Sequence, residues 1–404
     1  MGRLLKLLAC IIGVTLSLRA TAIEQDFDLS LDLRAVAASG QNSWLDNGGG
    51  KLRFDENHQG LRLGSLRLGY RTSLTDTLHL TAEAVSYGDH DKNPLDLTEL
   101  SLSWRPVPAS TLRSELKLGA FYPPISLEHR MRGWRTPYTL SASAINTWVG
   151  EELRTIGLEY NADWLRQANG KSWNFGVTGA LFGWNDPAGV IVALRGWSLH
   201  DRQTTLFGRV GQRGQGVTGG RILFYDEIDG RAGYYAAANA NYRGLVEIRA
   251  LRYDNRGNPT RMAPAIGDGA WLTRFNSAGV RVTPDDQWTF MWQRLQGSTD
   301  IGASPTNIWH FDSDYLLASW KHRAQRVSLR YDRFWMKQLA SSFGFFNHDY
   351  GHAFTAAWFY EFNPHVTVVA ESLEIDSDLG SRLWVGAPQD ARERQLQLAL
   401  RLEF

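Results

Sequence analysis

Three arginines stand close together in one polar segment of the chain, residues 123–150. They are Arg130, Arg132 and Arg135, and Glu128 is the one acid of that segment. Guanidinium groups bind phosphate and carboxylate groups through paired N–H donors, and they stay charged at physiological pH. The segment is therefore a candidate binding site for anionic solutes.

Each of these arginines also has a plainer interpretation, as the structural partner of a carboxylate elsewhere in the chain. Glu83 and Glu99 are candidate partners, because both fall on the polar side of predicted strands. The sequence leaves the choice between solute contact and ion pairing open.

Signatures of enzymes and metal sites are weak. Residues 169–172, NGKS, end like a phosphate-binding loop, but Leu165 occupies the place of its first glycine. His348 and His352 lie four apart without a predicted helix to align them, and no G-x-S-x-G motif occurs. The formal charge of +1 gives no basic face for nucleic acid. We therefore predict no catalytic residues, no metal and no cofactor.

The elements that must position the arginines are β-strands with one apolar and one polar face. The last residues, RQLQLALRLEF, alternate strictly, with Leu396, Leu398, Leu400, Leu402 and Phe404 on one side. The same two-residue period recurs along most of the chain. With 39 Gly, 12% aromatic and 21% charged residues, the composition is typical of a transmembrane β-barrel. Beyond the first residues, no apolar run approaches the ~20 residues of a membrane-spanning helix.

Short and long connections alternate between the predicted strands. Short turns are predicted at residues 72–77, 106–111, 161–171, 243–244, 283–287, 321–326 and 361–365, and long connections at 38–59, 89–95, 123–150, 185–231, 255–270, 297–312, 337–350 and 375–392. These connections separate sixteen strands, or eighteen if residues 190–210 form a further hairpin. The alternation predicts short periplasmic turns at one end of the barrel and long extracellular loops at the other.

Aromatic residues support a membrane location. Seven of them lie close to the predicted short turns, on the apolar side of their strands: Tyr70, Trp104, Tyr160, Tyr242, Trp288, Trp320 and Phe362. Phe404 shares their end. Amphipathic rings at one level around a barrel form an interfacial girdle.

Residues 1–22 have the pattern of a secretory signal peptide. Arg3 and Lys6 are basic, residues 7–18 are apolar, and Ala20-Thr21-Ala22 fits a cleavage site. A lipoprotein site at Cys10 is the alternative, although it would leave most of the apolar stretch on the product. The predicted mature chain is a single barrel domain, residues 23–404, without cysteine and therefore without disulfides.

The polar faces of the strands predict a charged lumen, because sixteen strands enclose an aqueous channel. Ten cations face it: Arg34, Arg62, Arg67, Arg113, Lys117, Arg249, Arg281, Lys321, Arg330 and Arg401. Ten acids oppose them: Asp28, Asp32, Glu83, Glu99, Glu115, Glu159, Glu247, Asp332, Glu371 and Glu403. We expect most of these residues to form cross-strand ion pairs.

Two features resemble known outer-membrane proteins. A final strand ending in Phe404 is similar to the closing strand of Gram-negative barrels, whose terminal Phe is read by the assembly machinery. The stretch GAFYPPISLE, after the inward-facing Lys117, resembles the phosphate-selective porin family (the O and P porins) and related substrate-specific porins. Acids interleave the arginines here, unlike that family's arginine ladder, and the family's lysine cluster near the constriction has only Lys117 as a counterpart.

The resemblance implies a trimeric porin whose third loop folds inward to form the pore constriction. We therefore predict an outer-membrane channel for passive diffusion of small hydrophilic solutes, with some anion preference. The residues expected at its constriction are Arg62, Arg67, Arg113, Lys117, Glu128, Arg130, Arg132 and Arg135. The alternatives are a plugged barrel acting as an adhesin or surface-binding protein, in which residues 185–231 fill the lumen, and an outer-membrane hydrolase.

Overall fold

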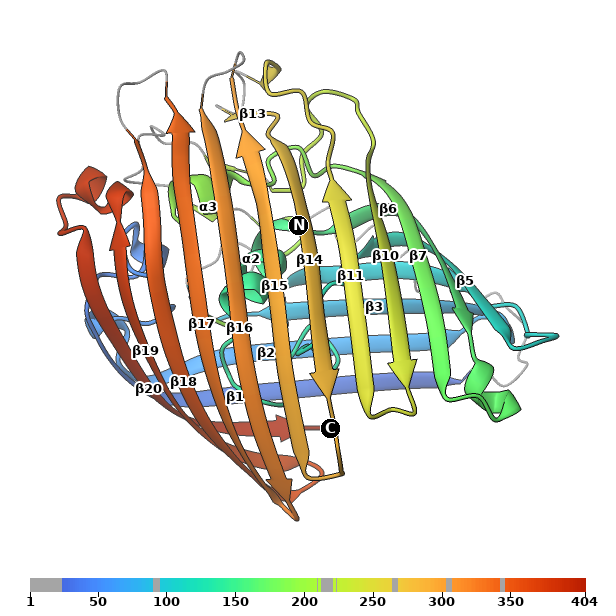
Figure 1. Cartoon of the computed structure of the whole chain (residues 1–404). Helices are drawn as coiled ribbons and strands as arrows, with labels where there is room; N and C mark the ends of the chain where they lie inside the picture. Colours follow the sequence, from blue (N-terminus) through green and yellow to red (C-terminus); the bar gives the residue numbers. More distant parts are fainter. Residues whose placement is uncertain are drawn as a thin grey trace.

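The chain folds into one closed antiparallel β-barrel (Figure 1). A computed structural model describes residues 24–89, 95–208, 210–211, 221–222, 224–263, 268–302, 307–341 and 346–404. The signal peptide predicted at residues 1–22 lies outside the described residues. Closure is made by the first and last strands, since β1 pairs with both β2 and β20.

The barrel contains sixteen strands, as predicted, each hydrogen-bonded to its neighbours in chain order. They are β1 (Gln25–Ser39), β2 (Gly60–Ser73), β3 (Leu78–Ser86), β4 (Asp96–Trp104), β5 (Leu112–Phe121), β6 (Thr155–Trp164), β7 (Trp173–Gly183), β10 (Gly233–Tyr242), β11 (Val246–Asp254), β14 (Leu272–Val282), β15 (Trp288–Asp300), β16 (Ile308–His322), β17 (Gln325–Ala340), β18 (His348–Asn363), β19 (Val366–Leu379) and β20 (Asp390–Glu403).

The two faces of each strand meet different surroundings, as the alternation predicts. On β20, Leu396 and Leu398 are more than half exposed on the outside, whereas Gln395 and Gln397 are buried inside. Such a surface is unfavourable in water and suits a lipid bilayer. None of the helices among the described residues is long and apolar enough to cross a membrane.

Short and long connections segregate to opposite ends of the barrel, which we call the turn end and the loop end. The eighteen-strand alternative is wrong: residues 190–194 form a short helix, and β8 (Val210–Gly211) pairs only with β9 (Arg221–Ile222) outside the barrel sheet. Another two-stranded sheet, β12 (Met262–Ala263) with β13 (Asp268–Gly269), lies in the fifth loop. Three loops are shorter than predicted, because strands β15 to β20 continue into the polar residues at 297–312, 337–350 and 375–392.

The predicted aromatic girdle lies on the outer surface. Trp104, Trp288, Phe362 and Phe404 are 40% or more exposed near the turn end. Phe27 joins them and packs on Tyr70, with ring centroids 4.7 Å apart.

Two helices lie inside the barrel, behind β15–β17 in Figure 1. Helix α2 (Ala144–Glu152) belongs to the third loop, residues 122–154, and α3 (Val190–Leu194) to the fourth loop, residues 184–232. Trp148 of α2 contacts Phe275 and Phe311 edge-on, at centroid distances of 5.4 and 5.3 Å. The two loops and the barrel wall thus share one apolar core.

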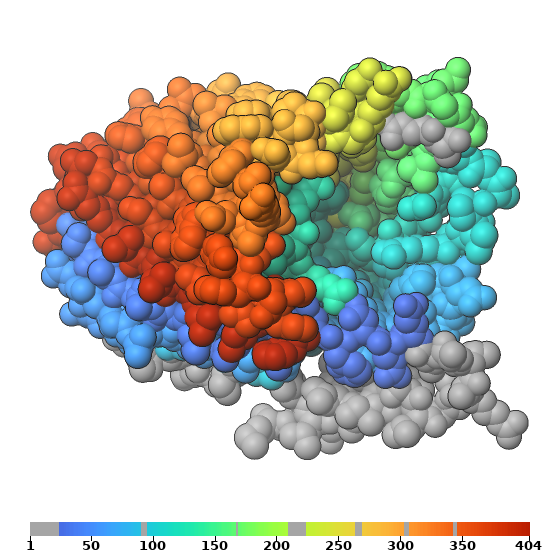
Figure 2. Space-filling view, turned by 90° about the horizontal axis from the view of Figure 1, so that it is seen from below, coloured from blue at the N-terminus to red at the C-terminus, as the bar shows by residue number. Residues whose placement is uncertain are grey.

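This core corrects the expectation of a uniformly polar lumen. We call β14–β19 the packed wall, because apolar side chains cover much of its inner face near the loop end: Phe275, Met291, Leu295, Phe311, Tyr315, Phe334, Met336, Leu373 and Ile375. We call β20 and β1–β7 the polar wall, whose inner face is mainly polar and charged. Viewed from the turn end, Figure 2 shows a hollow between the walls.

The first loop, residues 40–59, is fastened to distant parts of the barrel. Lys51 Nζ lies 2.7 Å from Asp349 Oδ2 of β18 and donates to the carbonyl of Trp197, while the Lys51 backbone donates to Glu393 of β20. Burial lowers the pKa of Lys51 to about 8, although Asp349 opposes that shift. The lysine ties the first and fourth loops to the packed wall and β20.

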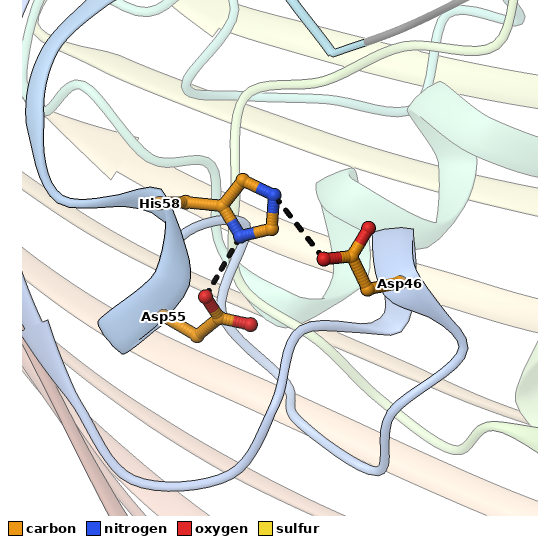
Figure 3. Close-up of side chains that lie close together, drawn as sticks. All are labelled: Asp46, Asp55 and His58. Atoms are coloured by element: carbon orange, nitrogen blue, oxygen red, sulfur yellow. Dashed lines mark hydrogen bonds and ion pairs between the residues drawn. The ribbon is translucent and has the colours of Figure 1, made fainter.

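Within the first loop, one histidine joins two short turns, η1 (Trp44–Asp46) and η2 (Glu56–His58). His58 Nδ1 lies 2.7 Å from Asp55 Oδ1, and Nε2 lies 3.4 Å from Asp46 Oδ2 (Figure 3). Asp55 also accepts hydrogen bonds from the backbone of Ser43 and Asn57. Both ring nitrogens therefore face carboxylates, and the imidazole acts as a bridge. Two further short turns are η3 (Arg166–Asn169) and η4 (Gly380–Val385).

Candidate pore constriction

The third loop folds into the barrel, as the resemblance implied. It leaves β5 at Pro123-Pro124, where proline cannot continue the ladder. Arg249 of β11 donates to Ser126 O at 2.9 Å, and on the other side Glu371 of β19 accepts from Ser141 N at 3.1 Å. Helix α2 then begins at the N-cap Ser143. The loop is held across the lumen by hydrogen bonds to its backbone.

Glu128, predicted at the constriction, is fully buried under the loop. It accepts hydrogen bonds from Ser143 N at 2.9 Å, Ser143 Oγ at 2.7 Å and Asn146 Nδ2 at 2.8 Å, and lies 3.6 Å from Arg330. Burial raises its pKa, but Arg330 and these hydrogen bonds outweigh burial, and the pKa falls below its usual range. Glu128 fixes the loop and does not face the arginines beside it in sequence.

The three arginines of the third loop diverge and meet three different carboxylates. Arg130 pairs with Glu247 of β11, Arg132 with Asp26 of β1, and Arg135 with Glu403 of β20 at 2.6 Å. Glu83, one of the carboxylates considered from the sequence, is bound by Arg71. All three thus form ion pairs; Glu247 and Glu403 were among the acids predicted to face the lumen, whereas Asp26 was not. Burial and the nearby Arg401 and Arg67 lower the pKa of Arg135 to about 10.

Three other predicted site residues lie apart from this loop. Lys117 pairs with Glu159 of β6 at 3.2 Å. Arg62 donates to the carbonyls of His58 and Asn57 near the loop end. Arg113 is exposed near the turn end and has no hydrogen-bonding or ionic partner among the described residues.

Arg67 occupies the most unusual position of the predicted residues. Its side chain is buried between β2 and the third loop, where Nη1 donates to Gly133 O at 3.0 Å and Nη2 to Tyr87 Oη at 3.1 Å. Its Nε has no hydrogen-bonding partner, and no carboxylate of the described residues forms an ion pair with it. Asp201 and Glu83 attract Arg67 without reaching ion-pair distance, so its buried charge is offset only indirectly and the site favours an anion.

Arg67 lines a small cavity between the third loop and the polar wall. The cavity offers about 20 Å³, enough for a guest the size of a water molecule. Its charged lining residues are Asp32, Arg34, Arg67, Arg135, Asp201, Arg202 and Arg401. Nε of Arg401 also lacks a partner among the described residues.

Among the described residues around this cavity, arginines outnumber acids. Ion pairs connect Arg34, Arg53, Arg202 and Arg401 through Asp32, Asp89 and Asp201, while the Arg135–Glu403 pair and Arg67 lie beside them. The arginines hold the pKa of Asp201 far below its usual range despite burial, so Asp201 is ionised. Burial lowers the pKa of His129 to about 4 and also lowers that of His200, so both rings are neutral. We call these ten residues the basic cluster.

Two members of the basic cluster that the sequence analysis missed come from the fourth loop. Asp201 bridges Arg34 at 2.6 Å and Arg53 at 3.0 Å, and Arg202 lies 3.3 Å from Asp89. The stretch SLHDRQ, rich in ionisable residues inside a long loop, was the one available signal. The third and fourth loops therefore meet at the basic cluster.

Solved structures share this architecture at low sequence identity. The outer membrane channel DcaP of Acinetobacter baumannii matches with a TM-score of 0.57 and 12% identity, over 96% of this chain and 99% of that one. The fold is that of a porin barrel. OmpT of Vibrio cholerae, an outer membrane protein, matches with a TM-score of 0.53 and 12% identity over 96% and 99% of the two chains. An anion-selective porin from Comamonas acidovorans matches with 0.51 and 13% over 95% and 100%.

No protein-family model matches the chain, and no curated protein matches its sequence. The shared fold applies to porins generally and does not single out the phosphate-selective family. The barrel and its apolar outer surface are those of bacterial outer-membrane proteins.

Proposed function

We propose that the protein is an outer-membrane porin that lets small hydrophilic solutes diffuse down their gradients, with a preference for anions. The observation that carries the anion preference is the basic cluster, where Arg67 has no ion pair among the described residues and its Nε has no hydrogen-bond partner. In a narrow passage shielded from bulk water, an unpaired charge acts on passing ions with little screening. Two of the matched structures are titled as a channel and as an anion-selective porin.

Two features of this proposal concern assembly. We propose a homotrimer, since one matched OmpT structure of Vibrio cholerae is described as a trimer form. We also propose that Phe404, exposed on the outer surface at the turn end, is recognised by the barrel assembly machinery. Outer-membrane lipid and small anionic solutes are the remaining partners.

A barrel with a closed lumen is the second candidate, and one observation favours it. Helices α2 and α3 pack into the loop-end half of the lumen, with Val190, Ile191, Val192 and Ala193 all buried. A barrel closed by its loops would serve as a surface-binding protein. Reconstitution into planar bilayers separates the two, because only a porin produces stepwise conductance.

The anion preference is tested by replacing Arg67 with glutamine and measuring the reversal potential in a salt gradient. We expect Arg67→Gln to move it toward cation preference. Arg394→Gln is the matched control, because it removes the same charge from the outer wall, where Arg394 is 58% exposed. An unchanged reversal potential in Arg67→Gln contradicts the anion preference and leaves the porin intact, whereas the absence of conductance steps in the unmodified protein contradicts the porin.

A hydrolase is tested in the same preparation with an ester substrate. Ser126 Oγ lies 2.8 Å from His129 Nδ1, but no carboxylate of the described residues forms an ion pair with that histidine. The third member of a hydrolytic triad is therefore missing at this pair. We expect no turnover, and ester hydrolysis lost in Ser126→Ala would overturn this expectation.

A further inference from the structure

The first loop holds a histidine between two carboxylates, as Figure 3 shows. His58 Nδ1 lies 2.7 Å from Asp55 Oδ1, and His58 Nε2 lies 3.4 Å from Asp46 Oδ2. The side chain of Asp46 is 54% exposed, that of His58 is 16% exposed, and that of Asp55 is 1% exposed. The three side chains therefore lead from the interior of the loop to the solvent.

The hydrogen bonds of Asp55 indicate where the imidazole carries its proton. Oδ1 of Asp55 accepts a hydrogen bond from Asn57 N at 2.8 Å, and Oδ2 accepts one from Ser43 N at 2.5 Å. A carboxylate that binds backbone N–H groups in this way is an acceptor, so the ring donates to it through Nδ1. In the neutral imidazole, Nε2 then carries the lone pair.

This lone pair of His58 faces a second acceptor. The 3.4 Å between His58 Nε2 and Asp46 Oδ2 exceeds the ~2.7–3.2 Å of an N–H···O hydrogen bond. Among the described residues, the carboxylate of Asp46 accepts no hydrogen bond, and His58 is its one ionic partner. Two groups that both offer lone pairs repel each other unless a cation lies between them. The pair is therefore a candidate site for a cation.

The spacing of the two atoms fits a tetrahedral zinc ion. Zinc binds imidazole nitrogen at roughly 2.0–2.1 Å and carboxylate oxygen at roughly 2.0–2.2 Å, so two such ligands at the tetrahedral angle lie roughly 3.4 Å apart. His58 Nε2 and Asp46 Oδ2 have this separation. A histidine that binds zinc commonly donates its other N–H to a carboxylate, which fixes the orientation of the ring. Asp55 occupies that position.

The two turns that carry the ligands are anchored independently of each other. Trp44 of η1 is 4% exposed and packs on the fourth loop, with its ring centroid 4.9 Å from that of His200. Arg62 of β2 donates to the carbonyl oxygens of His58 at 3.1 Å and Asn57 at 3.2 Å, which fixes η2. Because both ligands are held in place before an ion arrives, binding costs little conformational entropy.

A group of carboxylates in the fourth loop offers a comparison. Asp186, Glu227 and Asp229 also lie close together, but each of them accepts hydrogen bonds from backbone N–H groups. No imidazole belongs to this group among the described residues. Those backbone contacts explain the acids of the fourth loop as structural residues. The group in the first loop differs, because it contains an imidazole and a carboxylate without a hydrogen bond.

We propose that Asp46 and His58 bind a divalent transition-metal ion, zinc, and that Asp55 orients the imidazole. A nitrogen and an oxygen ligand together suit zinc, whereas calcium and magnesium take oxygen ligands. Water completes the coordination, since Asp46 is exposed. The ion would link η1, which packs on the fourth loop, to η2, which is attached to β2. The proposal does not depend on ion conduction through the lumen.

The test is calorimetric titration of the purified mature barrel in detergent, without an affinity tag and after treatment with a chelator. The probe is Zn²⁺ in a buffer that contains an excess of Ca²⁺. We expect one zinc ion to bind per chain. His58→Gln and Asp46→Asn should each weaken binding at least tenfold, because each removes one of the two protein ligands. Full affinity in either variant, or the absence of saturable binding in the unmodified protein, would overturn the proposal.

The role of Asp55 is tested with Asp55→Asn. This variant should bind zinc roughly ten- to a hundredfold more weakly, as the loss of a carboxylate behind a zinc-bound histidine does. The visible absorption spectrum of bound Co²⁺ should also change, because the imidazole loses the partner that raises its basicity. An unchanged spectrum would show that Asp55 does not act on the ion through the ring.

His352→Gln is the matched control for His58→Gln. His352 Nε2 lies 3.7 Å from Asp376 Oδ2, but no second carboxylate of the described residues forms an ion pair with this histidine. The variant should bind zinc as the unmodified protein does, and heat-modifiable mobility should confirm that all variants are folded. Equal loss of zinc binding in His352→Gln and His58→Gln would overturn the assignment to the first loop.

Discussion

The two walls of the barrel satisfy their backbone hydrogen bonds in the same way, but they differ in the side chains on their inner faces. Both pair every strand with its neighbours, but the polar wall keeps ionisable side chains inside, while the packed wall buries aromatic and aliphatic side chains against α2 and α3. The strands of the packed wall from β15 onward are also longer, at 13 to 16 residues, than β3–β7, at 9 to 11. A closed barrel can therefore have different inner faces on its two sides. Loops that pack against one side would confine a passage to the other side.

The largest effect is expected where β20 meets β1 and closes the barrel. Phe404 exchanges backbone hydrogen bonds with Leu29, at 2.9 and 3.0 Å, and its ring is 66% exposed. Phe404→Asp keeps the backbone and should still reduce assembled barrel severalfold, more than the loss of one contact of roughly 1 kcal/mol explains, because a recognition signal is also lost. The yield of heat-modifiable protein in outer membranes measures this.

Phe362→Asp is the comparison for that experiment, because Phe362 is 63% exposed at the same end of the barrel. Equal yields for the two variants would show that Phe404 acts only as an interfacial ring.

The second prediction concerns Trp148, which lies in the apolar core between the loops and the packed wall. Trp148 is 2% exposed and touches Trp197, Phe275 and Phe311, so Trp148→Ala should destabilise the packing of the loops by ~3–5 kcal/mol. The barrel ladder does not involve this residue and should remain closed. We expect faster protease cleavage in the third loop and a larger single-channel conductance.

Trp104→Ala, which truncates a ring that is 49% exposed on the outer surface, should leave both readouts unchanged. Unaltered conductance and cleavage in Trp148→Ala would mean that the backbone bonds to Glu371 and Arg249 alone hold the third loop.

The third prediction concerns pH. Glu152 at the end of α2 accepts hydrogen bonds from Trp148 and from the backbone of Gly189 and Ile191, joining the third loop to the fourth. Burial raises its pKa from 4.5 to about 8. Between these values the folded protein holds a proton that the unfolded protein has released, so stability falls as pH rises through this window.

Protease resistance of the two loops should therefore decline between about pH 4.5 and 8 in the unmodified protein. Glu152→Gln should flatten that decline, because glutamine does not titrate. A decline of the same slope in Glu152→Gln would assign the pH dependence to other groups.

The smallest effect is expected from the three paired arginines of the third loop. Replacing Arg130, Arg132 and Arg135 with alanine should move the reversal potential toward cations at low salt. Because Arg130 and Arg132 are 34% and 36% exposed, salt should screen most of their share as the Debye length falls from ~10 Å at 0.1 M to ~3 Å at 1 M. The shift caused by Arg67→Gln should persist better at 1 M, because Arg67 is buried.

If the triple variant keeps its whole shift at 1 M salt, these arginines face the narrow passage directly. If it shows no shift at low salt, they are purely structural, and the basic cluster alone sets selectivity.

The barrel was predictable from sequence because its signal is local. Each strand carries its own alternation, and each turn its own polar residues, so sixteen strands and their orientation follow without knowledge of distant contacts. The apolar core was not predictable in this way. Alternation shows which residues face inward, but it does not show whether an inward-facing residue contacts water or a loop. Phe334, Trp335 and Met336 give one hint, since three consecutive apolar residues indicate a strand covered on both faces.

The basic cluster was predicted only in part, because strand alternation does not show where loop residues lie. Arg34, Arg67 and Arg401 were assigned to the lumen from their strands, but Arg202 and Asp201 reach it from a loop without periodicity. Arg130, Arg132 and Arg135 are adjacent in sequence and separate in space, since the third loop spans the lumen and presents them to different strands. Closeness in the sequence of a loop is therefore weak evidence that residues belong to one site.

The position of Lys51 also bears on the order of events during assembly. Its partners come from the fourth loop, β18 and β20, so its cavity is complete only after the last strand has been added. A barrel closed one strand too early would lack Glu393 and expose this loop. The contacts of Lys51 therefore require the fourth loop, β18 and β20 to be in place together, as they are in the closed barrel.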